Sequence, residues 1–323
     1  MSKKKPKIVV IGGGTGTYQV LLGLRQYPVE LAAVVAMSDS GGSSGRLRKE
    51  LGILPPGDVR RALLALSALH LKKNTLSKLF DFRFNNGELA GHSVGNLLLA
   101  ALMQITGRTE VAISEAASFL EITGQVLPVT TSKTELVARL KDGTVIRGET
   151  NIDVRDIKPE VPIEEVYLSP RGRIFPGTRE AILGADLIVM GPGDLYTSLV
   201  PNLLVMGVNR AIKQSRANVA LIVNLMTKHG ETDGFKTGDF VREVQKYLGP
   251  ARQKLAYVLV SRKVRATPKI MRWYKRHKSE PVRNDLEKGK EFGLEVIVND
   301  FSQRGNLLRH DPKKIARMVV KLV

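Results

Sequence analysis

Short runs of β-branched residues that end in glycine-rich turns set the pattern at the start of the chain. Residues 7–11 (KIVVI) lead into a run from Gly12 to Gly16, which is followed by helical spacing of apolar residues. Residues 30–37 (ELAAVVAM) lead into a second turn rich in glycine and serine. A strand, a glycine turn and a helix in this order predict the opening of an open α/β sheet.

The same strand pattern returns in the second half of the chain. Apolar runs of strand length occur at residues 185–190 (ADLIVM), 219–224 and 255–261. The first ends in a Gly-Pro-Gly-Asp turn, and a polar segment through residue 234 follows the second. We therefore expect both halves of the chain to contribute strands to one parallel sheet.

Between these halves, the spacing of apolar residues along the chain changes twice. From 58 to about 123 the apolar spacing is helical, and from 126 to 176 the chain is β-rich and punctuated by proline. Asp-Gly at 142–143, between two β-rich runs, is a strong hairpin signal. We predict a nucleotide-binding core made of residues 1–125 and 177–323, with residues 126–176 as an inserted β-rich subdomain.

Composition narrows the class of protein. The chain has 323 residues, enough for roughly two globular units, and its 43% hydrophobic and 25% charged residues exclude a mostly disordered or fibrous protein. No apolar run approaches the roughly 20 residues of a membrane span. The basic start of the chain precedes an apolar stretch too short for a signal peptide. The absence of cysteine excludes disulfides and thiolate metal sites, so we expect a cytoplasmic protein.

The charge balance points to an anionic partner without identifying it. The formal net charge is +19, and such a charge attracts nucleotides, nucleic acid and acidic surfaces alike. Aromatic residues make up only 5% and are not interleaved with the basic ones, as a surface that stacks single strands would require. We expect no specific nucleic-acid recognition, although residues 262–278 are strongly basic.

Four of the predicted strands end in loops rich in glycine, hydroxyl and acidic residues. In an open parallel sheet, ligands bind outside the carboxyl ends of the strands, and glycine amides there can hold an anion. We expect these loops to form one nucleotide or phosphate site. Its candidates are Gly13, Gly14, Thr15 and Gly16; Asp39, Ser40, Gly41, Gly42 and Ser43; Gly191, Pro192, Gly193, Asp194 and Thr197; and Asn224, Thr227, Glu231 and Thr232.

Three further candidates lie outside these loops: Asp58, His92 and Asn96. Asp58 starts a predicted helix, where it is either an N-cap or a functional acid. His92 precedes another helix, where it is either a hydrogen-bonded structural residue or a general acid–base. For Asp39, three roles stay open: binding a ribose hydroxyl, holding a divalent cation, or capping its own turn.

Several familiar motifs are absent. Thr17 breaks the G-x-G-x-x-G spacing of a dinucleotide fingerprint, and no Gly-Lys-Ser/Thr follows as in a P-loop. With five histidines and no closely spaced pair, the chain does not indicate a zinc enzyme. Ser43 has glycine two positions before and two positions after it, the spacing of a Gly-x-Ser-x-Gly elbow, but we do not expect a serine hydrolase of that type.

The chain as a whole resembles the CofD/YvcK family, and is most similar to its YvcK branch of bacterial gluconeogenesis factors. The resemblance runs in family order from near residue 7 to near residue 312. The matching segments are IGGGTGT (11–17), DSGGSSGRLRKELGILPPGDVR (39–60), GHSVGNLLL (91–99), DGTVIRGE (142–149), GPGDLYTSLVPNLL (191–204), NLMTKHGETDGF (224–235) and LRHDP (308–312).

The resemblance implies a Rossmann-like three-layer α/β fold with an inserted β-rich piece, and a binding cleft formed by the same loops. For the YvcK branch it implies binding of UDP-sugars, notably UDP-N-acetylglucosamine, and a role in cell shape and wall synthesis on gluconeogenic carbon sources. It also implies protein partners in cell-wall regulation and no accepted catalytic activity. The CofD branch instead implies a transferase that uses a nucleotide diphosphate donor and a divalent cation such as Mg²⁺. The oligomeric state stays open, a homo-oligomer included.

Three positions depart from the family pattern. Relatives usually carry two adjacent acids ahead of the Gly-Gly-Ser-Ser-Gly stretch, but here the pair is Asp39-Ser40. The loss of one carboxylate weakens any metal-assisted transfer. Arg61 replaces a common asparagine, and Asp194 replaces a usual serine and would restore an acid if it faced the same cavity. We therefore expect a nucleotide-sugar-binding regulator, with a CofD-like transferase as the alternative.

Overall fold

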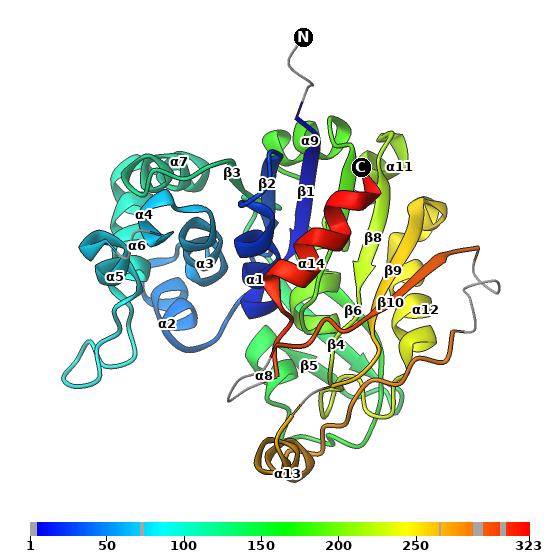
Figure 1. Cartoon of the computed structure of the whole chain (residues 1–323). Helices are drawn as coiled ribbons and strands as arrows, with labels where there is room; N and C mark the ends of the chain where they lie inside the picture. Colours follow the sequence, from blue (N-terminus) through cyan, green and yellow to red (C-terminus); the bar gives the residue numbers. More distant parts are fainter. Residues whose placement is uncertain (1–4, 72–73, 265, 287–292, 304–307) are drawn as a thin grey trace.

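A seven-stranded parallel sheet forms the centre of the computed structural model (Figure 1), which describes residues 5–71, 74–264, 266–286, 293–303 and 308–323. The basic start, residues 1–4, lies outside the described residues. In sheet order the strands are β10 (Glu295–Asn299), β9 (Leu255–Ser261), β8 (Asn218–Ile222), β7 (Leu187–Met190), β1 (Lys7–Gly12), β2 (Glu30–Val35) and β3 (Gln125–Pro128).

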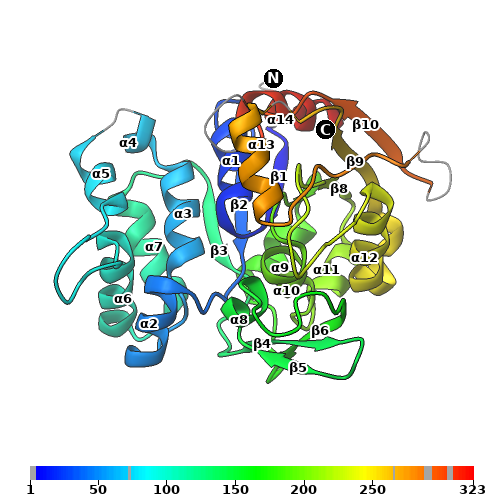
Figure 2. The same cartoon turned by 90° about the horizontal axis from the view of Figure 1, so that it is seen from below.

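Helices cover both faces of this sheet and give the expected α/β architecture. On one face α1 (Gly14–Leu24) packs beside α14 (Pro312–Val319), and the other face carries α9 to α12 (Figure 2). The bounds of these and of the remaining helix near the sheet are α9 (Pro176–Leu183), α10 (Val200–Leu203), α11 (Val208–Gln214), α12 (Thr237–Leu248) and α13 (Pro268–Arg276). Strands β1 and β7 are buried along almost their whole length, which explains their continuous apolar sequence.

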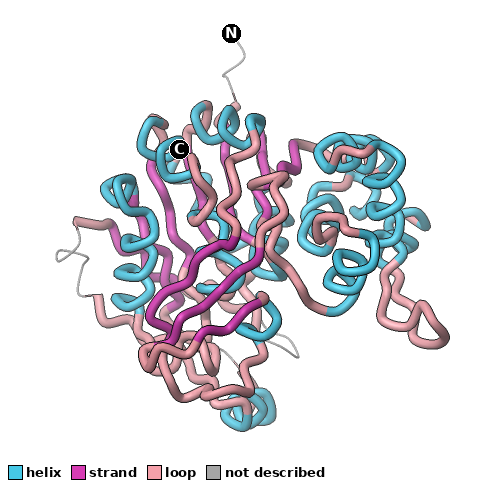
Figure 3. Tube along the Cα trace, turned by 180° about the vertical axis from the view of Figure 1, so that it is seen from behind, coloured by secondary structure: helices cyan, strands magenta, loops and turns pink. Residues whose placement is uncertain are grey.

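A helical lobe stands beside the β3 edge of the sheet (Figure 3). It comprises α2 (Gly42–Leu51), α3 (Gly57–Leu66), α4 (Ala68–Leu71), α5 (Thr75–Asp81), α6 (Val94–Thr106) and α7 (Thr109–Phe119). Helix α3 lies against α1, β2 and β3, and α7 lies against β3, so the lobe joins the core through these two helices. The helical period predicted for residues 58–123 is confirmed.

A small antiparallel sheet lies near the carboxyl ends of the main strands. Its order is β5 (Val145–Arg147), β4 (Glu135–Leu140) and β6 (Ile163–Ser169), and α8 (Glu149–Asp153) follows β5. The β4–β5 pairing confirms the hairpin predicted at Asp-Gly. In contrast, residues 126–128 were expected in the inserted piece but belong to β3, because they pair in parallel with β2 as the edge of the main sheet.

The chain order places a topological switch point between β1 and β7. From β1 the chain runs outward to β2 and β3, and it then returns to β7 and proceeds to β8, β9 and β10 on the other side. The four predicted loops follow strands β8, β7, β1 and β2. These strands are neighbours in the sheet, and all are parallel. Among the described residues, no helix has the length and apolar character needed to cross a membrane.

Candidate functional site

The four glycine-rich loops converge on one cleft of about 660 Å³ at the carboxyl edge of the sheet. Thr15, Asp39, Gly193 and Asn224, one from each loop, all line it. The other sequence candidates that line it are Gly13, Gly14, Gly16, Gly41, Gly42, Ser43, Asp58, Asn96, Pro192, Asp194 and Thr197. The convergence follows from the sheet order, because neighbouring parallel strands bring their carboxyl ends to one edge.

Close backbone approach explains the glycines of the first loop. A Cβ on Gly16 would lie 2.2 Å from the carbonyl oxygen of Pro192, so only glycine lets the loops after β1 and β7 touch. A Cβ on Gly13 would lie 2.3 Å from a carboxylate oxygen of Asp58. The N-terminus of α1 has no acidic residue in its own first turn and lines the cleft, and of its first amides the Gly14 N–H donates to Asp58.

Asp58 holds this first loop in place. Its Oδ1 accepts a hydrogen bond from the Gly14 N–H at 2.9 Å and lies 3.6 Å from Arg61 Nη1. It lies inside α3 and does not cap that helix, whose N-cap is Pro56. Burial, and next the carboxylate of Asp39, raise the pKa of Asp58 to about 6.

The second loop is fixed by Asp39 and by contacts with α8, which follows strand β5 of the small sheet. Asp39 Oδ1 accepts from the Gly41 N–H at 2.9 Å, so this side chain stabilises its own turn. Ser40 faces away from the cleft lining: its N–H donates to Glu149 and its hydroxyl accepts from the Thr150 N–H at 2.9 Å. Burial, and next the Asp39 carboxylate, raise the pKa of Glu149 to about 7.

His92 lies behind the cleft wall, where it contacts Ser43. Its Nδ1 is 3.0 Å from the Ser43 hydroxyl, and Asn96 Nδ2 donates to the same hydroxyl at 3.0 Å. Ser43 and Asn96 line the cleft, whereas the His92 ring does not. Burial, and next the charge of Arg46, lower the pKa of His92, so the imidazole is neutral at pH 7.

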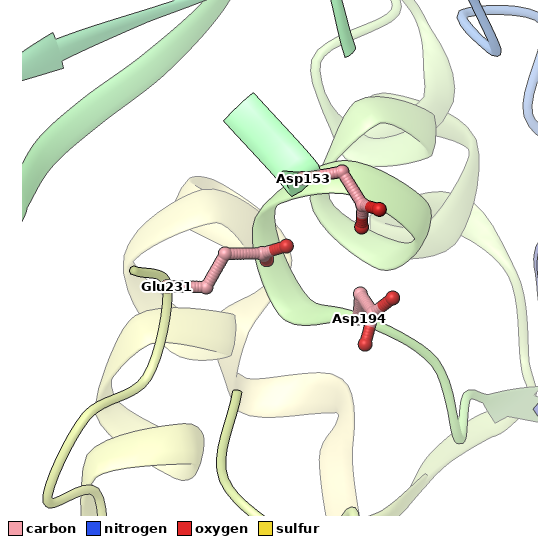
Figure 4. Close-up of side chains that lie close together, drawn as sticks. All are labelled: Asp153, Asp194 and Glu231. Atoms are coloured by element: carbon pink, nitrogen blue, oxygen red, sulfur yellow. The ribbon is translucent and has the colours of Figure 1, made fainter. Parts of the chain in front are cut away.

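The third and fourth loops meet through Asn224 and through a charged cluster. Asn224 Oδ1 accepts from the Gly193 N–H at 3.2 Å. Asp153 of α8, Asp194 and Glu231 point toward one another (Figure 4), and their carboxylate oxygens lie within 4.8 Å. Lys228 Nζ contacts Asp153, Asp194 at 2.8 Å and Glu231 at 3.7 Å. This lysine therefore connects α8 to the third and fourth loops.

Three predicted residues of the fourth loop, and one of the third, have structural contacts outside the cleft lining. Glu231 accepts from the Tyr196 N–H at 3.0 Å and from the Thr197 hydroxyl at 2.9 Å. The hydroxyls of Thr227 and Thr232 accept from the backbone N–H groups of Glu280 and Lys228. Gly191 precedes the cis Gly191-Pro192 bond, behind the lining residues.

Comparison with known proteins identifies the family. The family model described as 2-phospho-L-lactate transferase CofD matches residues 8–302. This chain belongs to the CofD family. Within the family, it is 41% identical to the gluconeogenesis factor of Halalkalibacterium halodurans, over 98% of this chain and 97% of that protein. It is 40% identical to the gluconeogenesis factor of Bacillus subtilis, over 99% of both.

A solved structure of the family confirms the fold. A UPF0052-family protein from Bacillus halodurans matches with a TM-score of 0.92 and 41% identity, over 99% of this chain and 100% of that one. The predicted resemblance to the YvcK branch of the CofD family is therefore confirmed, as is the predicted α/β sheet.

The metal chemistry associated with the CofD branch does not fit the acids around Lys228. The ammonium already lies among Asp153, Asp194 and Glu231, and both carboxylate oxygens of Glu231 accept hydrogen bonds. Burial lowers the pKa of Lys228, but the three carboxylates raise it more, so this pKa lies above its usual range. Asp194 therefore does not act as a free acid in place of the one that relatives carry beside Asp39.

Sequence reasoning missed the residues that close the cleft from outside the glycine loops. Among them are Arg83, Glu149, Thr150, Asp153, Trp273, Tyr274 and Arg309. Trp273 and Tyr274 lie on α13, inside the segment whose basic residues suggested only a charged surface. The LRHDP motif contained the one available signal for Arg309. Glu149 ends the matching segment 142–149, whereas Asp153 had no signal, because its approach to the cleft depends on how α8 and the small sheet pack.

Proposed function

We propose that this protein binds a nucleoside diphosphate sugar, of the UDP-N-acetylglucosamine type, in the cleft and acts as a regulator. The observation that carries the proposal is the convergence of the four loops. Two helix N-termini, those of α1 and α2, open into one cleft, and neither has an acidic residue in its first turn. Such termini bind phosphate groups through free amides and the helix dipole.

Basic side chains add to this preference for a diphosphate. Arg61, Arg83 and Arg309 line the same cleft. Guanidinium groups form charge-assisted hydrogen bonds to phosphate, each worth roughly 1.5–3 kcal/mol. Together with the amides of Gly13, Thr15, Gly16, Gly42 and Ser43, they provide donors for two adjacent phosphates, whereas the Gly14 and Gly41 amides donate to Asp58 and Asp39.

Flat and polar groups at the rim fit a base and a sugar. Trp273 and Tyr274 of α13 line the cleft and offer aromatic faces, and Trp273 is 45% exposed. Asn224 and Asp39 supply polar groups for ribose or sugar hydroxyls. The volume of about 660 Å³ lies within the usual range for small-molecule sites.

Titration calorimetry with UDP-N-acetylglucosamine, UDP and N-acetylglucosamine 1-phosphate tests this proposal. We expect the two nucleotides to bind and the sugar phosphate to bind at least tenfold more weakly. Arg61→Ala and Tyr274→Ala should each weaken binding at least tenfold, whereas Arg242→Ala, on the exposed side of α12, should not change it. No heat of binding at millimolar nucleotide would contradict the proposal.

The regulatory role extends the proposal to the cell. Two curated relatives that are 41% and 40% identical to this chain are named gluconeogenesis factors, and we propose a role here in cell shape and wall synthesis on gluconeogenic carbon sources. The test is growth and shape of a strain that lacks its own relative and expresses this chain. Wild type should restore both, and the Arg61→Ala variant should not.

A CofD-like transferase is the second candidate, favoured by the acids of the cleft. Asp58 and Glu149 have pKa values of about 6 and 7, which suit proton transfer near neutral pH. A nucleotide diphosphate donor incubated with Mg²⁺ and an acceptor alcohol should then be consumed. Loss of this turnover in Asp39→Asn would favour the transferase, and intact ligand after long incubation would exclude it.

A further inference from the structure

A serine, a histidine and an asparagine from two helix starts form one buried group on the wall of the cleft. Ser43 lies in the first turn of α2, His92 just before α6, and Asn96 in the first turn of α6. Ser43 and Asn96 line the cleft, and Ser43 is 5% exposed. The sequence marked all three residues as candidates but did not show that they meet, because Ser43 is 49 and 53 positions from its two partners.

The hydrogen bonds direct the serine proton toward the imidazole. Asn96 Nδ2 donates to Ser43 Oγ, so the Ser43 proton can go to His92 Nδ1, 3.0 Å away. A neutral imidazole accepts there when its proton is on Nε2. A hydroxyl bonded to a neutral imidazole is the arrangement of an activated serine.

The surroundings of Ser43 suit attack on phosphorus. The first amides of α2 have no carbonyl partner within the helix and can bind phosphate oxygens. Gly42, next to Ser43, has open space where a Cβ would lie, so a ligand can reach this turn. In addition, Asn96 is 2% exposed, and among the described residues no partner lies within hydrogen-bond distance of its Oδ1.

We propose that Ser43 is a nucleophile that slowly hydrolyses the diphosphate of a bound nucleoside diphosphate sugar, with His92 as its base and Asn96 as a positioning residue. Ser43 Oγ bonds to one phosphorus as the bridging P–O bond breaks, His92 takes up the serine proton, and the other phosphate leaves as an anion. Water then attacks the phosphoserine, and the Oγ–P bond breaks as Ser43 regains a proton. One water is consumed, and the products are a nucleoside monophosphate and a sugar phosphate.

Only the choice of substrate rests on the proposed function. The reactivity of Ser43 is a property of the protein alone and can be measured without the ligand. Slow hydrolysis would limit the time that the regulator spends in its ligand-bound state.

The absence of cysteine from the natural chain allows a direct test of reactivity. Ser43→Cys and Ser44→Cys each introduce one thiol into the same helical turn, at serines that are 5% and 4% exposed. With iodoacetamide at pH 7, Ser43→Cys should be alkylated at least tenfold faster, because only that thiol lies beside the imidazole. Equal rates, or a faster Ser44→Cys, would overturn the proposal.

Hydrolysis is measured on the wild-type protein with UDP-N-acetylglucosamine by ³¹P NMR. We expect UMP and sugar phosphate to appear, and His92→Gln to slow their formation at least 100-fold while Kd changes less than threefold. The rate should fall at acid pH as His92 gains a proton; Arg46, Glu50 and Arg83 are the charged groups that face it. Binding without any product would overturn the hydrolysis, and absence of binding would instead contradict the proposed function.

Discussion

Asp58 and Glu149 are acids on the wall of a cleft whose other features attract anions. Both carboxyls have raised pKa values, because each is buried near the Asp39 carboxylate. A raised pKa means that the folded protein holds these protons more tightly than the unfolded chain does. The two acids therefore stabilise the fold least at high pH, where both are ionised.

Ligand affinity should rise as the pH falls. A bound diphosphate raises the pKa of Glu149 above about 7 and of Asp58 above about 6, so binding takes up protons near neutral pH. We expect Kd for UDP-N-acetylglucosamine to decrease about tenfold between pH 8 and pH 6, in calorimetry without divalent cations. Glu149→Gln, which keeps the oxygen that accepts from Ser40, should flatten this dependence. A Kd independent of pH would show that the phosphates lie far from both acids.

We expect Lys228 to contribute more to the free energy of unfolding than an ordinary surface lysine does. Lys228→Gln leaves Asp153, Asp194 and Glu231 close together without their cation. Because Glu231 is buried, we expect the free energy of unfolding to fall by about 2 kcal/mol in urea titrations at pH 7.5. Lys213→Gln, on the exposed side of α11, is the control and should change it by less than about 0.5 kcal/mol. Equal effects would mean that the cluster is solvated.

Whether the sequence could predict a residue of the site depended on how far along the chain its contact partner lies. Glycines and Asp39 were predictable, because each serves its own turn at a strand end. Ser43 with His92, and Lys228 with Asp153, were not, because their partners lie 49 and 75 positions away and no local pattern connects them. For Asp58 the sequence suggested an N-cap, whereas its actual contact is with Gly14, 44 positions away.

At the scale of elements, burial decided what the sequence could predict. Strands β1, β2, β7, β8 and β9 are largely buried, so continuous apolar runs marked them. Strand β10 went unpredicted, because it is an edge strand with exposed residues and its apolar run, at 296–298, is only three residues long. The assignment of β3 to the inserted piece was wrong, because a four-residue strand does not reveal which sheet it joins.

The packing of α14 on α1 depends on Gly23. A Cβ at this position would lie 2.1 Å from the carbonyl oxygen of Pro312, which is backbone and cannot turn aside. We expect Gly23→Ala to lower the free energy of unfolding by at least about 2 kcal/mol in urea titrations, despite the better helix propensity of alanine. Gly184→Ala, whose Cβ meets its nearest atom at 3.4 Å, should cost far less. A neutral Gly23→Ala would mean that α14 shifts freely along α1.

At the scale of the whole molecule, the cleft is lined by parts that are far apart in the sequence. Its lining comes from the main sheet loops, from α2, α3 and α6 of the helical lobe, from α8 beside the small sheet, and from α13. A ligand that fills this cleft would contact all of these segments at once. Binding should therefore stabilise these segments together, by about 2.7 kcal/mol at a ligand concentration 100 times Kd.

Hydrogen–deuterium exchange measures this coupling segment by segment. With saturating UDP-N-acetylglucosamine, we expect slower exchange in four separate regions: the N-terminus of α1, the N-terminus of α2, the loop after β7 and helix α13. The reason is that each contributes donors or contact surface to the same cleft. The sheet end at Lys7 and Glu30, on the opposite edge, serves as an internal control and should show little change. Protection confined to α13 would indicate a ligand held at the rim by the aromatic residues, with the glycine loops left free.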